Sequence, residues 1–224
     1  TRRFTPTCLA YAMSKSPLGP YEYKGVIIDN LGCDPYVWND HGSVIEFDGK
    51  WYVFYHRSTH GDRYMRKACV EPLEFREDGT IVEAEMTTQG TAGPLDGYAT
   101  LDAYRACLLD GHVRISIMDG RDDREMLSRM RDGDWAAFKY LDFGTRAPRK
   151  VVLRVRSING GTIGVGFNQL YWGNAASVDV PAGNVWTEVS ADIDGDYAGV
   201  RAVLLRTSGD PDKDLFDVDW IRFE

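Results

Sequence analysis

A short polar cluster, Asn39-Asp40-His41, stands directly before a stretch in which polar and apolar residues alternate. Histidine and carboxylate side chains are the groups that most often transfer protons in enzyme sites. Functional sites tend to be built where strands end, so these residues form the first candidate site. The alternative is that His41 is an ordinary loop histidine whose ring is satisfied by its neighbours.

A predicted β-hairpin positions this cluster. Residues 43–47 alternate polar with apolar, and residues 51–55 are aromatic and β-branched, as strands favour. Between them, Asp48-Gly49 is the dipeptide that suits a two-residue type I′ turn. The polar cluster is therefore expected at one end of a sheet.

Composition narrows the class of protein. The chain has 224 residues, of which 43% are hydrophobic, so it can bury a substantial core in one or two domains. No run approaches the ~18 apolar residues that a membrane helix needs, so we predict no membrane partner. The net charge of −8 and the lack of a basic stripe argue against nucleic acid as a partner.

The four cysteines, Cys8, Cys33, Cys69 and Cys107, are widely scattered. No Cys-x-x-Cys pair is present, so neither a zinc ribbon nor a thioredoxin-like site is expected. Most of the cysteines are expected to be buried as small apolar residues, and the spacing leaves a disulfide and the redox compartment open. The chain starts at Thr1 without a signal-peptide pattern, which predicts a processed N-terminus or a fragment.

The N-terminal part of the chain is predicted to be all β. After a strand at residues 7–13, Ser16-Pro17-Leu18-Gly19-Pro20 predicts a turn, because Pro and Gly fix the backbone there. Residues 86–94, rich in Thr and Gly, predict a linker between domains at 1–92 and 93–224. Further strands are predicted at residues 23–28, 64–70, 73–75 and 80–82.

The C-terminal part of the chain predicts a β-sandwich. Turns such as Asn159-Gly160-Gly161 and Asp194-Gly195-Asp196 separate short strand-like runs at the spacing typical of that fold. Trp51, Trp135 and Trp220 fall within alternating strands and are expected in the core. The predicted strands are residues 112–118, 135–143, 150–157, 162–168, 176–180, 185–193, 199–207 and 216–223.

The stretch from Trp38 to Arg57 resembles the last blade of the glycoside hydrolase family 43 propeller. It carries the family's His-containing step before a strand, a Gly turn, and then Trp51-Tyr52-Val53-Phe54-Tyr55-His56. Upstream, Tyr11-Ala12-Met13-Ser14-Lys15-Ser16-Pro17-Leu18-Gly19-Pro20 resembles the preceding blade. The resemblance implies the last blades of a five-bladed β-propeller, which here is partial.

The same resemblance assigns roles to two residues. It implies that His41 points into the central channel and helps to hold a metal ion or its water shell beneath the substrate. It also implies that Arg66 faces the active site, where the alternative is an arginine at the surface or strand edge.

Catalytic acids are not expected in this chain. Glycoside hydrolysis needs one carboxyl group to protonate the leaving oxygen and another to activate water. In family 43 these acids lie in earlier blades, and none has a counterpart here. Near the hairpin, Glu46 alternates with its strand neighbours, Asp48 belongs to the turn, and Asp34 and Asp40 are expected to orient loops. We therefore expect no hydrolysis by the chain alone.

The second half resembles carbohydrate-binding module family 6. The residues that carry the resemblance are Gly133-Asp134-Trp135-Ala136-Ala137-Phe138, Leu141-Asp142-Phe143-Gly144 and the terminal Phe216-Asp217-Val218-Asp219-Trp220-Ile221-Arg222-Phe223. The resemblance implies a jelly-roll β-sandwich that binds carbohydrate.

In family 6, an aromatic platform stacks on the sugar and an Asn hydrogen-bonds its ring. Trp186 matches the platform Trp, whereas Arg129 stands in place of the expected Tyr and Asp217 in place of the Asn. An Arg–Trp pair could clamp a neutral or acidic sugar; alternatively, binding has been lost and Trp186 is a core or rim aromatic. Trp172, in a loop-like stretch, is a second candidate sugar contact.

The family resemblance also implies a structural calcium ion. Asp102 and Asp219 match two of the acidic positions that hold it, while Tyr104 stands where a second acid is expected. Calcium prefers six to eight oxygen ligands, so this change predicts a weakened site. The alternative is that Asp219 simply caps the final strand.

These resemblances predict the C-terminal part of a family 43 enzyme, an α-L-arabinofuranosidase or β-xylosidase, acting on arabinoxylan- or xylan-type polysaccharide. Its predicted partners are that polysaccharide and the missing N-terminal blades, because a propeller protects its sheet edges by closing the ring. The substrate implies an extracellular or periplasmic location. The alternative is a non-catalytic carbohydrate-binding (lectin-like) or structural module.

Overall fold

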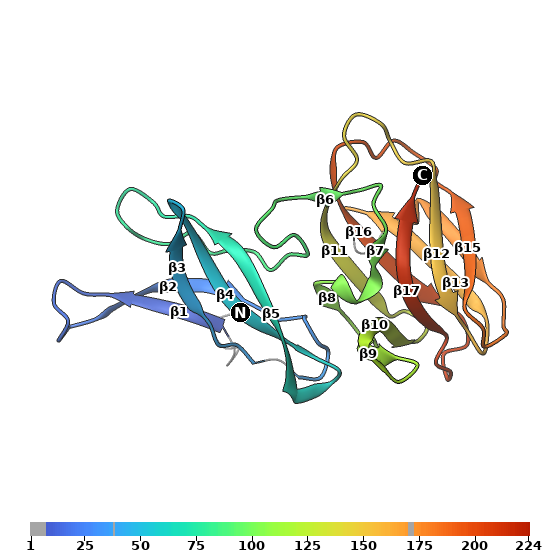
Figure 1. The fold of residues 1–224 in the computed structure, drawn as a ribbon, viewed down its shortest axis with the longest axis horizontal. Coiled ribbons are helices and arrows are strands. Elements are labelled where there is room, and N and C mark those ends of the chain that lie inside the picture. The colour runs from blue at the N-terminus through green and yellow to red at the C-terminus, as the bar shows by residue number, and fades with distance from the viewer. Residues whose placement is uncertain (1–7, 38, 170–172) are drawn as a thin grey trace.

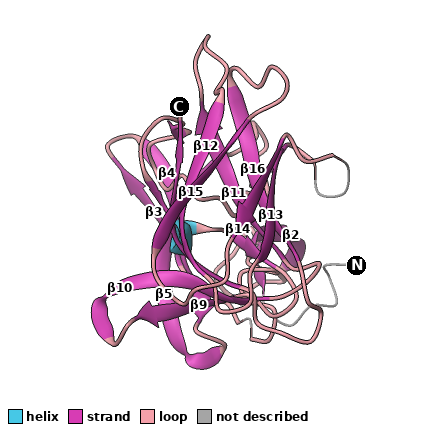
Figure 2. Cartoon of the chain, turned by 90° about the vertical axis from the view of Figure 1, so that its right-hand side faces the viewer, coloured by secondary structure: helices cyan, strands magenta, loops and turns pink. Residues whose placement is uncertain are grey.

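The computed structural model describes residues 8–37, 39–169 and 173–224. Strands dominate it, and the helical element within these residues is the short 3-10 helix η2 (Ala103–Arg105) (Figure 2). Two units lie side by side, a smaller N-terminal one and a larger C-terminal one (Figure 1). In the described part of the chain, no helix has the length and apolar character needed to cross a membrane. The predicted all-β fold class is confirmed.

The N-terminal unit consists of two antiparallel sheets. β1 (Cys8–Met13) pairs with β2 (Glu22–Asp29). β3 (Ser43–Phe47), β4 (Lys50–Thr59) and β5 (Asp62–Leu73) form a three-stranded sheet in that order. The two sheets correspond to the two blades expected from the sequence.

The central hairpin forms as predicted. Phe47 on β3 lies opposite Lys50 on β4. Asp48 and Gly49 between them have positive φ values of 50° and 71°, as a type I′ turn requires. Val53, further along β4, is fully buried in the core of this unit. The turn residues and the pattern of apolar residues therefore favour the same pairing register of β3 with β4.

The tryptophans predicted to be core residues are not in the core. Trp51 is 39% exposed and packs edge to face on Phe75, with ring centroids 5.2 Å apart. Trp135 and Trp220 are only partly buried. Trp51 lies on the same face of β4 as the buried Val53 and Tyr55, but it stands next to the hairpin turn, at the exposed end of the strand. The neighbouring β3 is exposed along its whole length.

The C-terminal unit is a β-sandwich of two sheets. One has the strand order β15-β12-β17-β10-β9 and the other β14-β13-β16-β11-β6, with β7 beside β17 and β8 beside β11. All pairs are antiparallel except β6 with β11. The bounds are β6 (Leu95–Asp96), β7 (Leu101–Asp102), β8 (Leu108–Leu109), β9 (Arg114–Met118), β10 (Arg121–Met130), β11 (Trp135–Asp142), β12 (Lys150–Arg156), β13 (Gly161–Phe167), β14 (Ala176–Val180), β15 (Thr187–Asp192), β16 (Val200–Ser208) and β17 (Phe216–Phe223).

One core fills the space between these sheets, and an aromatic cluster closes one part of it. Phe143 contacts Tyr98, Phe167 and Phe223 edge to face, with centroids 5.6, 5.8 and 5.2 Å away. Phe143 is only 2% exposed. Such aromatic pairs add about 0.5–1.5 kcal/mol beyond their buried area.

The strand β10 was not predicted from the sequence. Its first half is polar, so it lacks the alternation that indicates a half-buried strand. Its Glu125 forms an ion pair with Lys67 of β5, in the other unit. Contact with the N-terminal unit therefore covers a strand whose own sequence does not predict burial.

The two units share a packed seam. Cys107, which follows η2, is fully buried in the core of the N-terminal unit. The backbone N–H of Leu109 donates to the carbonyl oxygen of Gly32 at 2.7 Å. The segment predicted as a linker packs here too, since residues 86–88 are buried. All four cysteines are free thiols, and Cys33 is buried as Cys107 is.

Replacing Phe143 with alanine is expected to lower the free energy of unfolding by about 3–5 kcal/mol, because the lost ring leaves a cavity. Urea denaturation followed by circular dichroism measures the loss. Phe47→Ala is the matched control, because Phe47 is 71% exposed and its loss should cost less than about 1 kcal/mol. Equal losses in the two variants would contradict the core described above.

Candidate functional site

His41 lies two residues before β3 and is exposed at the end of the hairpin. The loop that carries it is fixed by Asn30, whose side-chain amide donates to the carbonyl oxygens of Asn39 (2.6 Å) and His56 (2.8 Å). The His56 ring also hydrogen-bonds the side chain of Asn39. These contacts tie the loop to β4 and hold His41 at the strand end.

Burial perturbs two ionisable groups beside His41. Both carboxylate oxygens of Asp40 are buried, with no hydrogen-bond partner among the described residues. This burial raises the pKa of Asp40 from 3.8 to about 7, and the nearby charge of Asp29 adds to the effect. Burial also lowers the pKa of His56, and the positive charge of Arg66 lowers it further.

The structure therefore brings His41 and Arg66, both predicted site residues, into electrostatic range of His56. Sequence reasoning missed His56 as a site residue, although it ends the aromatic strand that carries the family resemblance. Asp34 is committed to the fold, because its two oxygens accept from the backbone N–H groups of Tyr36 (2.9 Å) and other loop residues. The group can bind a polar ligand but presents no pair of free carboxylates.

Metal binding was predicted at His41. Among the residues that the structure describes, no three His, Cys, Asp or Glu side chains are grouped to hold a metal ion. The role of His41 toward a metal ion or its water shell stays a prediction.

The calcium site predicted at Asp102 and Asp219 does not fit the residues present. The carboxylate of Asp219 is ion-paired with Arg124 at 2.8 Å and with Arg154. Asp102 is exposed on the short strand beside β17. Two guanidinium groups already neutralise the one buried carboxylate, whereas calcium needs several oxygen ligands free to approach it.

A pocket of about 280 Å³ on the sandwich contains two of the predicted sugar-binding residues. Arg129 and Asp217 meet there with Arg156 and Asn184. Asp217 is the second residue of β17 and lies directly opposite Arg156, the last residue of β12. Antiparallel pairing of these two strands therefore places a cation against a carboxylate at the pocket.

Arg156 is the centre of this polar network. Its Nε and Nη2 donate to Oδ2 of Asp217 at 3.1 and 2.7 Å, and its Nη1 donates to Oδ1 of Asp119 at 2.6 Å. Burial raises the pKa of Asp217, and the bond from Arg156 offsets part of that rise. Hydrogen bonds from Trp186 and Arg156 lower the pKa of the exposed Asp119.

Trp186 is held within the same network. Its indole N–H donates to Oδ2 of Asp119 at 2.9 Å. The guanidinium groups of Arg154 and Arg156 lie over its ring, 5.2 and 4.8 Å from the centroid. Such cation–π contacts stabilise by about 0.5–2 kcal/mol, so a sugar stacking on that face must compete with arginine. Trp172 lies outside the described residues.

Arg129 is the uncommitted cation of the pocket. It is exposed, and its side chain makes no hydrogen bond or ion pair with any residue that the structure describes. Its donors and the acceptor oxygens of Asp217 can serve sugar hydroxyl groups. The pocket is therefore suited to binding, and it contains no nucleophile with an adjacent base.

The model of carbohydrate binding module family 6 matches residues 110–224, a little more than half of the chain. The chain belongs to carbohydrate-binding module family 6. The model of glycosyl hydrolases family 43 matches residues 3–81. The N-terminal unit is thus the C-terminal part of a family 43 fold, joined to a family 6 module.

Relatives match across both units. A xylosidase/arabinosidase from Thermoclostridium stercorarium is 33% identical over 220 residues, which cover 83% of this chain and 45% of the relative. The crystal structure of a family 43 arabinoxylan arabinofuranohydrolase from Bacillus subtilis, in complex with cellotetraose, has 26% identity and a TM-score of 0.60 over 98% of this chain and 48% of its own. The chain thus spans less than half the length of these relatives.

The family 6 module also matches isolated modules in fold. A module from Clostridium stercorarium, in complex with cellobiose, has a TM-score of 0.52 and 23% identity, covering 59% of this chain and 98% of that one. This match supports the sandwich architecture.

Asp40→Asn is expected to flatten the pH dependence of stability. Because the pKa of Asp40 is raised to about 7, the folded state holds the proton more tightly than the unfolded state, so stability falls as pH rises from about 4 to 7. Asparagine cannot ionise, so the variant should melt about 2–4 °C higher than the wild type at pH 7. Thermal unfolding between pH 4 and 8 measures this, with Asp48→Asn as the exposed control. A slope unchanged in Asp40→Asn would contradict the buried environment.

Arg156→Ala is expected to destabilise the family 6 module by about 1–3 kcal/mol, because Asp217 is left partly buried without its partner. The double variant Arg156→Ala/Asp217→Asn should recover part of this loss, since the unpaired charge is gone. Chemical denaturation of the four members of the cycle measures the coupling. Additive losses would show that the two side chains do not interact.

Proposed function

We propose that this chain is part of an extracellular or periplasmic enzyme that hydrolyses arabinoxylan- or xylan-type polysaccharide, as an α-L-arabinofuranosidase or β-xylosidase. The observation that carries the proposal is that both units, in order, match relatives named xylosidase/arabinosidase and arabinoxylan arabinofuranohydrolase. The chain covers 45% and 36% of the first two relatives, so it supplies part of the machinery.

In this proposal, the N-terminal unit binds substrate but does not supply the proton-transferring acids. Hydrolysis requires two carboxyl groups in separate roles. Asp34 is tied to backbone N–H groups, and the carboxylate oxygens of Asp40, beside His41, are buried. Arg66 and His41 are left to contact the substrate, while the acid and base come from other blades.

The exposed apolar edge supports further blades as the partner of this unit. β3 is the edge strand of its sheet, and its Ile45 and Phe47 are 48% and 71% exposed. An exposed strand edge with apolar side chains promotes association. A propeller covers such edges by closing its ring, so the missing blades of the same protein are the occupants that we propose.

The family 6 module binds the polysaccharide through the pocket at Arg129, Arg156 and Asp217. Arg129 donates to sugar hydroxyl groups and Asp217 accepts from them, with Trp186 at the margin. Non-catalytic, lectin-like carbohydrate binding is the second candidate function. It is favoured by the same pocket, which offers polar contacts without an acid–base pair.

Isothermal titration of the 224-residue chain with xylohexaose and arabinoxylan oligosaccharides tests the binding. We expect heat from the wild type and about tenfold weaker binding by Arg129→Ala, since one charge-assisted hydrogen bond is lost. Arg206→Ala is the matched control, because Arg206 is an exposed arginine on β16 that does not line the pocket. No heat from the wild type would overturn the binding role.

The proposal that the catalytic acids come from other blades can be tested on the purified chain. The chain alone is expected to release no product from aryl arabinofuranosides or xylosides, because its described carboxylates near His41 are committed or buried. Turnover by the purified chain, retained in Asp40→Asn, would show that the acids lie elsewhere in this sequence.

A further inference from the structure

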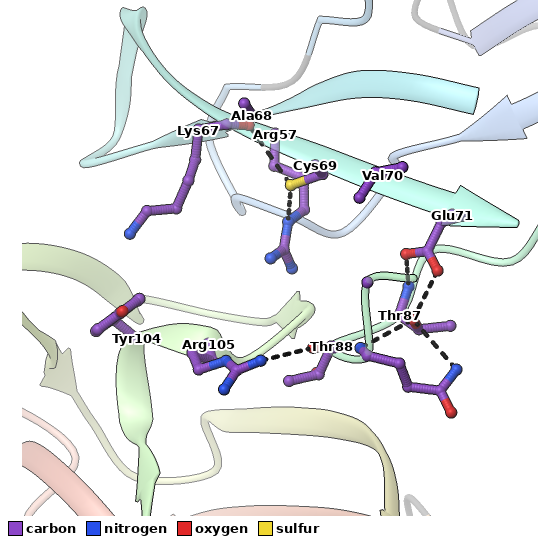
Figure 3. Close-up of a pocket in the computed structure, with 12 residues that line it drawn as sticks. Arg57, Lys67, Ala68, Cys69, Val70, Glu71, Thr87, Thr88, Tyr104 and Arg105 are labelled. Carbon is purple, nitrogen blue, oxygen red and sulfur yellow. Dashed lines mark hydrogen bonds between the residues drawn. The ribbon is translucent and has the colours of Figure 1, made fainter. Parts of the chain in front are cut away.

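A second pocket lies on the seam between the two units, between β5 and η2 (Figure 3). Its volume is about 290 Å³, which suits a ligand the size of a single sugar ring. Arg57, Lys67 and Glu71 point into it from β4 and β5, and Arg105 faces them from η2 (Figure 3). Three cations and one carboxylate therefore share a small, partly enclosed space.

Arg57 contacts no carboxylate of the described residues. Its Nε donates to Sγ of Cys69 at 3.0 Å and its Nη1 to the carbonyl oxygen of Ala106 at 3.2 Å. No acidic side chain in the described part of the chain forms an ion pair with it. Removing a guanidinium from water without an opposite charge is costly, so an anion in the pocket would stabilise this arrangement.

Glu71 does not fill that role, because its oxygens are committed elsewhere. It accepts from the Tyr55 hydroxyl at 3.1 Å and from the backbone N–H and hydroxyl of Thr87, both at 2.8 Å. Glu71 is only 3% exposed. Burial raises the pKa of its carboxyl group, and its hydrogen bonds and, to a smaller extent, the nearby charge of Arg57 offset part of that rise. The carboxylate therefore faces its own hydrogen-bond donors and leaves the pocket with a positive excess.

Arg105 has donors to spare. Its one hydrogen bond within the described residues runs from Nη2 to the carbonyl oxygen of Thr88, and it is long, at 3.4 Å. Lys67 differs, because it is ion-paired with Glu125 and lies over the Tyr104 ring at 3.9 Å. Arg57 and Arg105, one from each unit, are thus the two cations whose charge is not matched by a contacting carboxylate.

We propose that this seam pocket binds a small oxyanion, and that the carboxylate of an acidic sugar is the ligand that suits its size and mixed lining. The two guanidinium groups would hold the carboxylate, and the Thr and Gln side chains of residues 87–89 would meet the hydroxyl groups. Because the two arginines come from different units, occupancy joins the units. The assignment to a sugar acid rests on the proposed function, whereas the oxyanion site does not.

Titration of the whole chain with glucuronate, glucose and inorganic phosphate at low ionic strength tests the proposal. We expect glucuronate to bind and to raise the melting temperature, glucose to do neither at the same concentration, and added salt to weaken the effect. Phosphate binding without glucuronate binding would overturn the assignment of a sugar acid as the ligand. Binding of neither anion would overturn the site, even if xylo-oligosaccharides bind the sandwich.

Two variants locate the anion. Arg105→Gln is expected to weaken glucuronate binding about tenfold, because a charge-assisted contact is lost. Arg206→Gln removes the same charge from β16, away from the pocket, and should leave the affinity unchanged. Equal weakening in both variants would mean that the net charge of the protein, and not this pocket, determines glucuronate affinity. That result would overturn the site. Loss of glucuronate binding in Arg129→Ala, with Arg105→Gln unaffected, would show that the anion binds in the pocket on the sandwich, which would also overturn the seam site.

A measurement on the wild-type chain avoids any question of folding. Cys69 lines the seam pocket, whereas Cys8 lies on β1 away from it. Glucuronate is expected to slow alkylation of Cys69 by iodoacetamide several-fold and to leave Cys8 unchanged, as read by peptide mass spectrometry. Unchanged alkylation of Cys69 at a saturating concentration would overturn the seam pocket as the binding site.

Discussion

The arrangement of the molecule depends on residues 103–109, which are hydrogen-bonded to both units. The backbone N–H of Cys107 donates to Ala137 of the sandwich at 2.9 Å, and that of Leu109 donates to Gly32 of the N-terminal unit at 2.7 Å. The Cys107 side chain is fully buried in the N-terminal core. Two small antiparallel sheets are only marginally stable alone. The sandwich therefore completes a core that the N-terminal unit does not close by itself.

Polar and charged contacts then fix the relative placement of the two units. His60 and Lys67 of the N-terminal unit converge on Glu125 of β10, and the Arg114 guanidinium lies over the Tyr36 ring at 3.4 Å. Partly buried charges are stable only beside their partners, so a shift of one unit would leave several charges unpaired. Apolar burial thus holds the units together, while charge pairing selects one orientation. Arg57 and Arg105 of the seam pocket differ from these residues, because no carboxylate of the described residues contacts them.

Local patterns predicted much of the fold, and contacts between distant segments account for what they missed. The hairpin was predictable because Asp48-Gly49 and the alternation in β3 and β4 act within a few residues. The strand β10 was not, because its charged Glu125 is partnered by His60 and Lys67 of the other unit, far away in sequence. Trp51 was misassigned to the core because alternation predicts which face of a strand is buried but not how far along the strand the core extends. Val53 and Tyr55 on that face are buried, whereas Trp51, next to the turn, is 39% exposed.

The pocket at Arg129 and Asp217 shows the same limit of sequence-based prediction for single side chains. Sequence comparison brought Arg129, Asp217 and Trp186 together, because the family pattern marks their positions. It did not indicate Arg156, whose contact with Asp217 arises only from the register of β12 against β17. Yet Arg156 lies over the Trp186 ring and engages Asp217, so it competes with a sugar for both.

Consequently, this pocket cannot bind sugar as a bare aromatic platform does. A ligand that stacks on the face of Trp186 beneath Arg156 must displace a guanidinium that is also hydrogen-bonded to Asp119 and Asp217. Stacking on an aromatic ring rewards any flat apolar sugar face, whereas hydrogen bonds to charged groups depend on where hydroxyl groups point. Recognition here is therefore expected to depend on hydroxyl geometry more than on apolar area.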